Sequence, residues 1–271
     1  MKKKKKKKAN SRSILRFICA CLALFCLGYF ALYCFMSNNS SSDFQDLSRL
    51  KDKINTKNEE DSGVYTPPTV KLDAIEEAPD MLEEFSTLYA KNKSIVGWIT
   101  IDDTPIDYPV MQSKNEEYYL NHNFDQKTDN NGSIFIDADC SIWPRSQNII
   151  IYGHNMKSGK MFGTLDKYKQ PDYYEKHPEI QFDTLYNKGT YRIMYVFNDT
   201  VHEESEVTFK YYQFVDANSA EEYNSNMNEM AAKSLYDTGV TSHLGDELIT
   251  LSTCDYSEGA ERFVVVAKRV N

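Results

Sequence analysis

The sequence predicts a mainly β domain, an antiparallel barrel or sandwich with helical decoration. Short runs of β-branched and apolar residues, bounded by turn residues, recur from residue 95 onward. From about residue 70 onward only two segments show helical spacing, and a stretch of about 200 residues is long enough for one sizeable core. The candidate strands are Ile95–Ile101, Ile106–Met111, Ser133–Ile136, Ile149–Tyr152, Tyr191–Asn198, Val207–Phe214, Glu247–Leu251 and Phe263–Val270.

Apolar residues at intervals of three and four predict the two helices. One follows Pro79-Asp80, and the second covers Ser219 to Tyr236. The apolar face of the first helix contains Met81, Leu82, Phe85, Leu88 and Tyr89, and that of the second contains Tyr223, Met227, Met230, Ala231 and Leu235.

The N-terminus predicts a membrane anchor. Lys2 to Lys8, Arg12 and Arg16 precede an uncharged apolar run from Phe17 to Met36. At ~1.5 Å per residue such a run covers the ~30 Å hydrocarbon core of a bilayer, and the basic residues favour a cytoplasmic N-terminus. A cleaved signal peptide is the alternative, but the run exceeds a signal's ~7–15 apolar residues and no small-x-small site follows it.

The remainder is therefore expected outside the cytoplasm. Residues 1–13 form the basic tail, 14–36 the anchor and 37–74 a polar spacer with one short helix around Phe44 to Ile54. Without the nine basic residues of the tail and anchor, 22 Lys and Arg face 40 Asp and Glu. This acidic balance excludes the basic footprint of a nucleic-acid-binding protein.

Cysteine usage points to a single thiol with a chemical role. Four cysteines lie in the apolar run, where they act as small hydrophobes, which leaves Cys140 and Cys254. A Cys140–Cys254 disulfide is one alternative, although it would block the thiol of Cys254, the candidate nucleophile. Cys140 has no nearby base in the sequence and is interpreted as a structural or surface-loop thiol.

Three residues at strand ends suggest nucleophilic catalysis. Cys254 ends the strand Glu247-Leu-Ile-Thr-Leu-Ser-Thr-Cys, His154 ends Asn148-Ile-Ile-Ile-Tyr-Gly-His, and Arg262 begins the last strand. A thiol can attack a carbonyl, an imidazole can exchange protons and a guanidinium can stabilise a developing oxyanion. Each also has an ordinary interpretation, as a buried strand residue, a rim residue or a salt-bridge partner. The other histidines lie in polar loops without metal-ligand spacing, so neither a metal site nor a cofactor is expected.

Together these motifs resemble the sortases, and in detail class B. The resemblance rests on Thr250-Leu-Ser-Thr-Cys254 with Arg262 eight residues on, Ile149-Ile-Ile-Tyr-Gly-His-Asn-Met-Lys-Ser-Gly-Lys-Met-Phe-Gly163 and Asn131-Gly-Ser-Ile-Phe-Ile-Asp137. It covers roughly residues 75–271. It implies a closed β-barrel of about eight strands, helices at its N-terminus and a long helix before the last two strands.

The resemblance also implies the activity, a membrane-anchored cysteine transpeptidase on the outer face of a Gram-positive cell. Such an enzyme cuts a C-terminal sorting motif of a secreted protein after threonine and joins the protein to a cell-wall amine, such as that of a lipid-linked peptidoglycan precursor. Cys254 would be the nucleophile, His154 the acid and base, and Arg262 the group that holds substrate or oxyanion. Substrate-groove positions of the family match Asn123, Ser252 and Thr253, and more weakly Tyr212, because Tyr211 lies beside it.

Two other functions fit parts of the pattern. An exported cysteine endopeptidase would use the same residues with water as the acceptor. A tethered binding module would leave the placement of Cys254, His154 and Arg262 unexplained.

Overall fold

The computed structural model describes residues 19–31, 44–52, 78–115, 117–203, 205–254 and 261–271. The chain divides into two units, Met1–Gln45 and Asp46–Asn271. In the first unit residues 19–31 are helical. Among the helices that can be described, none combines the length and the apolar character needed to cross a bilayer.

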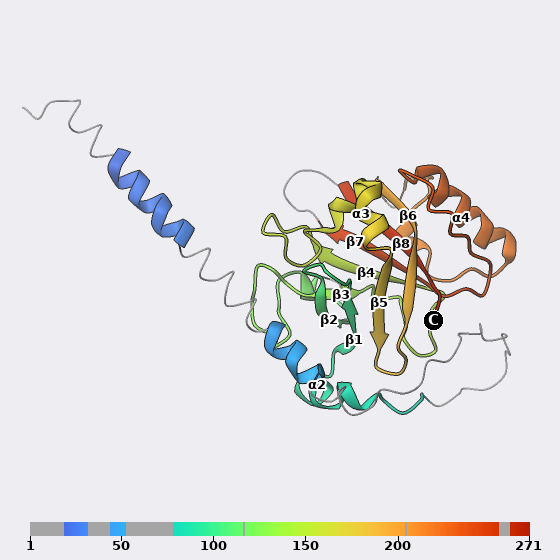
Figure 1. Ribbon diagram of the computed structural model, residues 1–271, viewed down its shortest axis with the longest axis horizontal. Helices are drawn as coiled ribbons and strands as arrows, with labels where there is room; N and C mark the ends of the chain where they lie inside the picture. The colour runs from blue at the N-terminus through green and yellow to red at the C-terminus, as the bar shows by residue number, and fades with distance from the viewer. Residues whose placement is uncertain (1–18, 32–43, 53–77, 116, 204, 255–260) are drawn as a thin grey trace, which may run out of the picture. The chain divides into compact units, whose positions relative to one another are not determined.

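In the described part of the second unit, eight strands close into a barrel (Figure 1). Their order around the barrel is β1-β2-β3-β4-β7-β8-β6-β5, and β5 pairs with β1 to complete it. The strands are β1 (Ile95–Thr100), β2 (Asp107–Met111), β3 (Ile134–Ile136), β4 (Asn148–His154), β5 (Glu179–Thr184), β6 (Thr190–Thr200), β7 (Leu248–Cys254) and β8 (Glu261–Arg269). The predicted closed, mainly β fold is confirmed.

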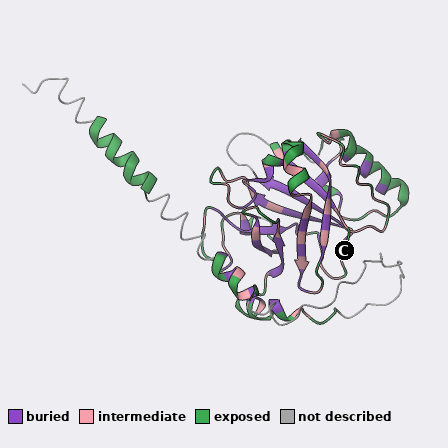
Figure 2. Cartoon of the chain, viewed as in Figure 1, coloured by how far each residue is buried: buried purple, intermediate pink, exposed green. Residues whose placement is uncertain are grey.

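Two of the strand pairs are parallel, β2 with β3 and β4 with β7. Parallel strands are normally covered on both faces, and the three isoleucines from Ile149 to Ile151 are fully buried, as are Ile249 and Leu251 on β7. Figure 2 shows this burial running through the central strands. The isoleucine run therefore became a central strand rather than an edge.

One predicted strand is wrong and one strand was missed. Residues 207–214 contain no strand; they carry the short helix η4 (Tyr211–Gln213), and Val207 is exposed. The long strand β6 already pairs with β8 along Tyr191 to Thr200, so the closed barrel leaves no edge for this segment. The missed strand is β5, in which buried Ile180, Phe182 and Thr184 alternate with partly exposed polar residues.

Helices cover the barrel at several places, and both predicted helical regions exist. The described helices are η1 (Glu83–Phe85), α2 (Ser86–Lys91), η2 (Tyr118–Leu120), η3 (Leu165–Lys169), α3 (Pro171–Lys176), η4 and α4 (Ala220–Lys233), together with residues 44–52. Within the second unit, Asp183 on β5 forms an ion pair with Lys51 at 3.3 Å, which fastens residues 46–52 to the barrel.

The helix α4 precedes the last two strands and packs beside β6 (Figure 1). The Ser219 hydroxyl caps it by accepting from the Glu222 amide at 3.1 Å. Tyr223, Met227 and Met230 are buried against β6 and β8, and each contributes about 1.5–3 kcal/mol of hydrophobic stabilisation. The helix ends at Lys233, three residues earlier than predicted, and the expected face members Ala231 and Leu235 are exposed.

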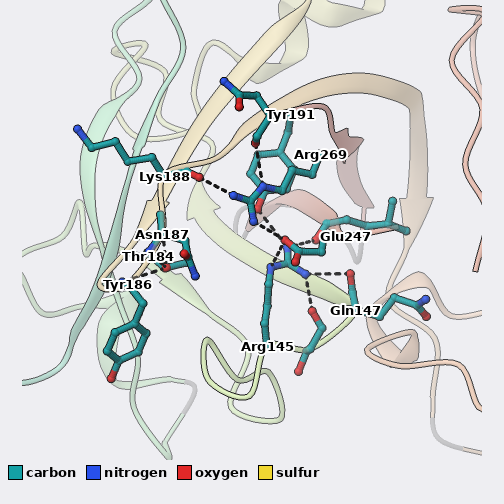
Figure 3. A network of polar contacts seen from close by, with 12 residues as sticks. Arg145, Gln147, Thr184, Tyr186, Asn187, Lys188, Tyr191, Glu247 and Arg269 are labelled. Carbon is teal, nitrogen blue, oxygen red and sulfur yellow. Dashed lines mark hydrogen bonds and ion pairs between the residues drawn. The ribbon is translucent and has the colours of Figure 1, made fainter. Parts of the chain in front are cut away.

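A network of charged side chains holds the start of the β4–β7 pair (Figure 3). Glu247 accepts from Arg269 at 2.8 Å and lies 3.1 Å from the Arg145 Nε. Arg145 also donates to the Leu248 carbonyl at 2.8 Å and to the Tyr191 hydroxyl at 3.2 Å. These contacts align β7 with β4 at the end of the pair opposite to His154 and Cys254.

Candidate active site

The parallel β4–β7 pair brings His154 and Cys254 side by side. Its register runs without interruption from Asn148 opposite Leu248 to His154 opposite Cys254. Neighbouring strands lie about 4.8 Å apart, and paired residues in the same register face the same side of the sheet. A hundred residues of chain separate the two, so the strand pairing alone makes them neighbours. The Cys254 side chain lies outside the described part of the structure.

The antiparallel β7–β8 ladder brings Arg262 to the same place. The ladder pairs Ser252 with Val264, and each step forward along β7 is one step back along β8. Two further steps in that register set Cys254 opposite Arg262. The Phe263 amide donates to the Thr253 hydroxyl at 2.9 Å, which fastens the two strands between these positions. The three residues predicted for catalysis therefore occupy one row across three adjacent strands.

The His154 ring is held by the last residue of η2. Its Nε2 lies 2.6 Å from the Leu120 carbonyl oxygen. Because a carbonyl oxygen can only accept a hydrogen bond, this contact requires the proton on Nε2. The nitrogen that can take up or release a further proton is then Nδ1.

Close packing behind the strand fixes the backbone beside His154. A Cβ atom on Gly153 would stand 2.4 Å from the Ile134 Cδ1 atom and 2.8 Å from the Phe162 ring. The backbone amide of Phe162 donates to the His154 carbonyl at 3.0 Å. Glycine is therefore required where β4 approaches β3 and the loop after β4.

The hydroxyls of Ser252 and Thr253 are both buried. The Ser252 hydroxyl is 2.8 Å from the Tyr211 hydroxyl of η4, and the Thr253 hydroxyl accepts from Phe263. Ser252 is wholly buried and Thr253 is 2% exposed. These side chains hold the strand that carries Cys254, and their contact with substrate stays a prediction.

The two tyrosines of η4 have different partners. The buried Tyr211 reaches Ser252, whereas the Tyr212 hydroxyl exchanges hydrogen bonds with the backbone of His202 at 3.1 Å. Tyr211 was missed as a candidate because its partner Ser252 is 41 residues away in sequence. The predicted groove residue Tyr212 anchors the loop after β6, and its contact with substrate stays a prediction.

Asn123 lies in the loop directly after η2, the short helix that holds the His154 ring. Its side-chain oxygen accepts from the Lys127 amide at 3.0 Å, which closes the turn after η2. Leu120, which supplies the carbonyl that contacts the His154 ring, is the last residue of η2. Asn123 and His154 therefore belong to one side of the site.

Cys140 is a free, buried thiol within the described chain, so the disulfide alternative does not form. Its sulfur accepts from the Ile150 amide at 3.4 Å. Burial raises the pKa of the Cys140 thiol to about 12. Cys140 is thus structural and unreactive, and among the described residues no group of three or more His, Cys, Asp or Glu could hold a metal ion.

The sequence and the fold both match known proteins. The family model for the sortase domain matches residues 99–270. Sortase B of Listeria monocytogenes is 36% identical over 212 residues, which cover 76% of this chain and 81% of that protein. The structure of a Staphylococcus aureus sortase B–substrate complex matches with a TM-score of 0.73 and 29% identity, covering 87% of this chain and 98% of that one.

A sortase B complexed with triglycine matches almost equally well, with a TM-score of 0.72 and 29% identity over 87% of this chain and 99% of the other. Identity above a third over most of the sequence and a shared fold agree with the row of thiol, imidazole and guanidinium positions. The chain belongs to the sortase family and is a cysteine transpeptidase of the sortase B type.

Proposed function

We propose that this protein is a membrane-anchored sortase B-like transpeptidase that cuts a C-terminal sorting motif of secreted proteins after threonine and transfers the protein to a cell-wall amine. The observation that carries this proposal is the register that sets His154 opposite Cys254 at the shared end of β4 and β7. Arg262 occupies the adjacent strand in the same row.

In the first half-reaction, the Cys254 thiolate attacks the carbonyl carbon of the threonine. The C–S bond forms, and the negative charge that develops on the carbonyl oxygen is stabilised by the Arg262 guanidinium. The C–N bond then breaks, and the leaving amine takes a proton from His154. The product is a thioester between the secreted protein and Cys254.

In the second half-reaction, an amine attacks the thioester carbon and gives a proton to His154. The C–S bond breaks, an amide forms and the Cys254 thiolate is released, so the enzyme returns to its initial state. The triglycine-bound sortase B supports an acceptor with a primary amine on a short peptide. We assign the acceptor to a lipid-linked peptidoglycan precursor.

The loops around the row are the proposed binding surface for the sorting motif. The Asn123 loop lies on the His154 side, and the loop after β6, held by Tyr212, leads into η4. Between these two loops lies the end of β7, where Ser252 and Thr253 directly precede Cys254. The substrate complex of the S. aureus relative supports a substrate-binding surface on the shared fold.

The proposed location is the outer face of the cell membrane, with a cytoplasmic N-terminus. The apolar run from Phe17 to Met36 and the preceding lysines in the sequence support it. An amine on a lipid-linked precursor would then be within reach of a tethered enzyme.

A peptide library tests this proposal with the full chain. Peptides that vary around an internal threonine are incubated with and without triglycine, and products are identified by mass spectrometry. We expect cleavage after threonine, a ligated triglycine product and complete loss of both with Cys254→Ala. Cleavage with no ligated product at any triglycine concentration would instead identify an endopeptidase, and retained cleavage in Cys254→Ala would exclude this nucleophile.

A further inference from the structure

The row that contains the predicted catalytic residues extends by one strand to Asp199. In the antiparallel β6–β8 ladder, Asp199 is paired directly with Arg262. Directly opposed residues of antiparallel strands point to the same face, with Cβ atoms about 4.5–5.5 Å apart. The order across β4, β7, β8 and β6 is therefore His154, Cys254, Arg262 and Asp199.

The Asp199 carboxylate is buried and only half satisfied. Its side chain is 4% exposed. Oδ1 accepts from the Lys233 Nζ at 3.0 Å and from the Thr200 amide at 2.9 Å, and the His202 Nε2 lies 3.8 Å away. Oδ2 has no hydrogen-bond partner among the described residues. A buried carboxylate oxygen without a hydrogen bond is costly, so it calls for an explanation.

Docking of α4 explains only one of the two oxygens. Lys233 is the last residue of α4, and its ion pair with Oδ1 ties that helix to β6. The second oxygen, Oδ2, remains unexplained, and the residue paired with Asp199 on the neighbouring strand β8 is Arg262. A guanidinium has five N–H donors in a planar fork, a geometry that matches a carboxylate.

We propose that Asp199 is a positioning residue for Arg262. Asp199 on β6 and Cys254 on β7 flank the strand that carries Arg262. The Asp199 carboxylate attracts the guanidinium and so restricts the orientations that the long arginine side chain can adopt when substrate binds. A donor that is oriented before the reaction stabilises the oxyanion at no further cost of reorganisation. The kinetic part of this inference rests on the proposed function.

Two single variants separate positioning from helix docking. Asp199→Asn keeps the shape of the side chain and removes its charge, whereas Lys233→Met breaks the same ion pair and keeps the Asp199 charge. We expect Asp199→Asn to lower kcat about 10- to 100-fold with KM changed less than threefold, because the loss is felt mainly in the transition state. Lys233→Met should keep kcat within about twofold. Equal losses of kcat in both variants would assign Asp199 to helix docking and overturn the inference.

A double-mutant cycle with Arg262→Lys gives the second kinetic readout. If Asp199 acts through the guanidinium, Asp199→Asn should cost less than about threefold in kcat when Arg262 is already lysine. Independent, multiplicative losses would contradict the inference.

A third measurement does not depend on turnover. The Arg262 Nε–Hε signal is assigned in ¹⁵N NMR spectra of the full chain in detergent by its loss in Arg262→Lys. We expect its exchange with water to be at least fivefold faster in Asp199→Asn than in Lys233→Met. Equal exchange rates would overturn the inference, even if no peptide of the library were cleaved. Absence of cleavage by the unmutated chain would refute the proposed function alone.

Discussion

The buried hydroxyl pair of Tyr211 and Ser252 offers a sharp test of how the β7 strand is held. The two oxygens are 2.8 Å apart, Tyr211 is 1% exposed and Ser252 is wholly buried. Tyr211→Phe leaves the Ser252 hydroxyl without this partner, and Ser252→Ala does the same to Tyr211. An orphaned buried polar group costs about 1–3 kcal/mol. For a domain of this size, ~2–4 °C per kcal/mol gives a melting temperature lower by roughly 3–10 °C.

The double variant makes the prediction specific. With both hydroxyls removed neither one leaves the other without this partner, so the double variant should lose less stability than the two single losses combined, by about 1 kcal/mol or more. Denaturant unfolding measures the four free energies of unfolding at constant m-value. Tyr212→Phe is the matched control. The Tyr212 side chain is partly exposed and its hydroxyl contacts the backbone of a loop, so its removal should lower the free energy of unfolding by less than about 1 kcal/mol.

Cleavage of a sorting-motif peptide by the same variants completes the test. If Ser252 only holds the strand, kcat/KM should fall similarly in Ser252→Ala and Tyr211→Phe. The reasoning would be refuted if Ser252→Ala lost activity with unchanged stability while Tyr211→Phe kept its activity. Ser252 would then contact substrate directly, as the family resemblance suggests.

Three further changes test other parts of the structure. Gly153→Ala, whose Cβ would stand 2.4 Å from Ile134, should cost about 1–3 kcal/mol and displace His154, lowering kcat more than tenfold; unfolding and kinetics together check both effects. Glu247→Gln should lower the free energy of unfolding by about 2 kcal/mol and leave kcat unchanged, because the charged network lies at the far end of β4 and β7. Burial raises the pKa of Cys140 to about 12, so its thiolate is scarce at lower pH. The stability that the neutral Cys140 thiol gives to the folded protein is lost only as pH rises from about 8.5 to about 12. Iodoacetamide at pH 8 should therefore alkylate Cys254 and spare Cys140 in the native protein, as judged by peptide mass mapping; equal alkylation would show Cys140 to be accessible.

Most of the barrel could be predicted from the sequence because its strands are locally distinct. The isoleucines of β4 and the valines of β8 form apolar runs that turn residues bound on both sides. β5 was not predicted because Glu179, Gln181 and Asp183 alternate with its buried residues, which makes the average composition of the strand polar. Residues 207–214 have the composition of a strand, but the closed barrel leaves them no partner.

The candidate active site likewise has a part that the sequence predicts and a part that it does not. His154, Cys254 and Arg262 could be found in the sequence because each stands at the end of a recognisable strand. The contacts that support them are not local. Tyr211 meets Ser252, and Asp199 is set opposite Arg262, only after barrel closure has fixed the registers.

Register is therefore the property on which the chemistry depends. A slip of one residue between β4 and β7 would turn His154 and Cys254 to opposite faces of the sheet, while the apolar content of both strands stayed the same. Hydrophobic burial alone cannot prevent such a slip here, because the central residues of both strands are buried on both faces. The polar contacts can: Glu247 with its two arginines fixes one end of the pair. At the other end the Ser252 hydroxyl bonds to Tyr211 and the Thr253 hydroxyl accepts from Phe263, so a shifted strand would leave buried hydroxyls and charges unpaired.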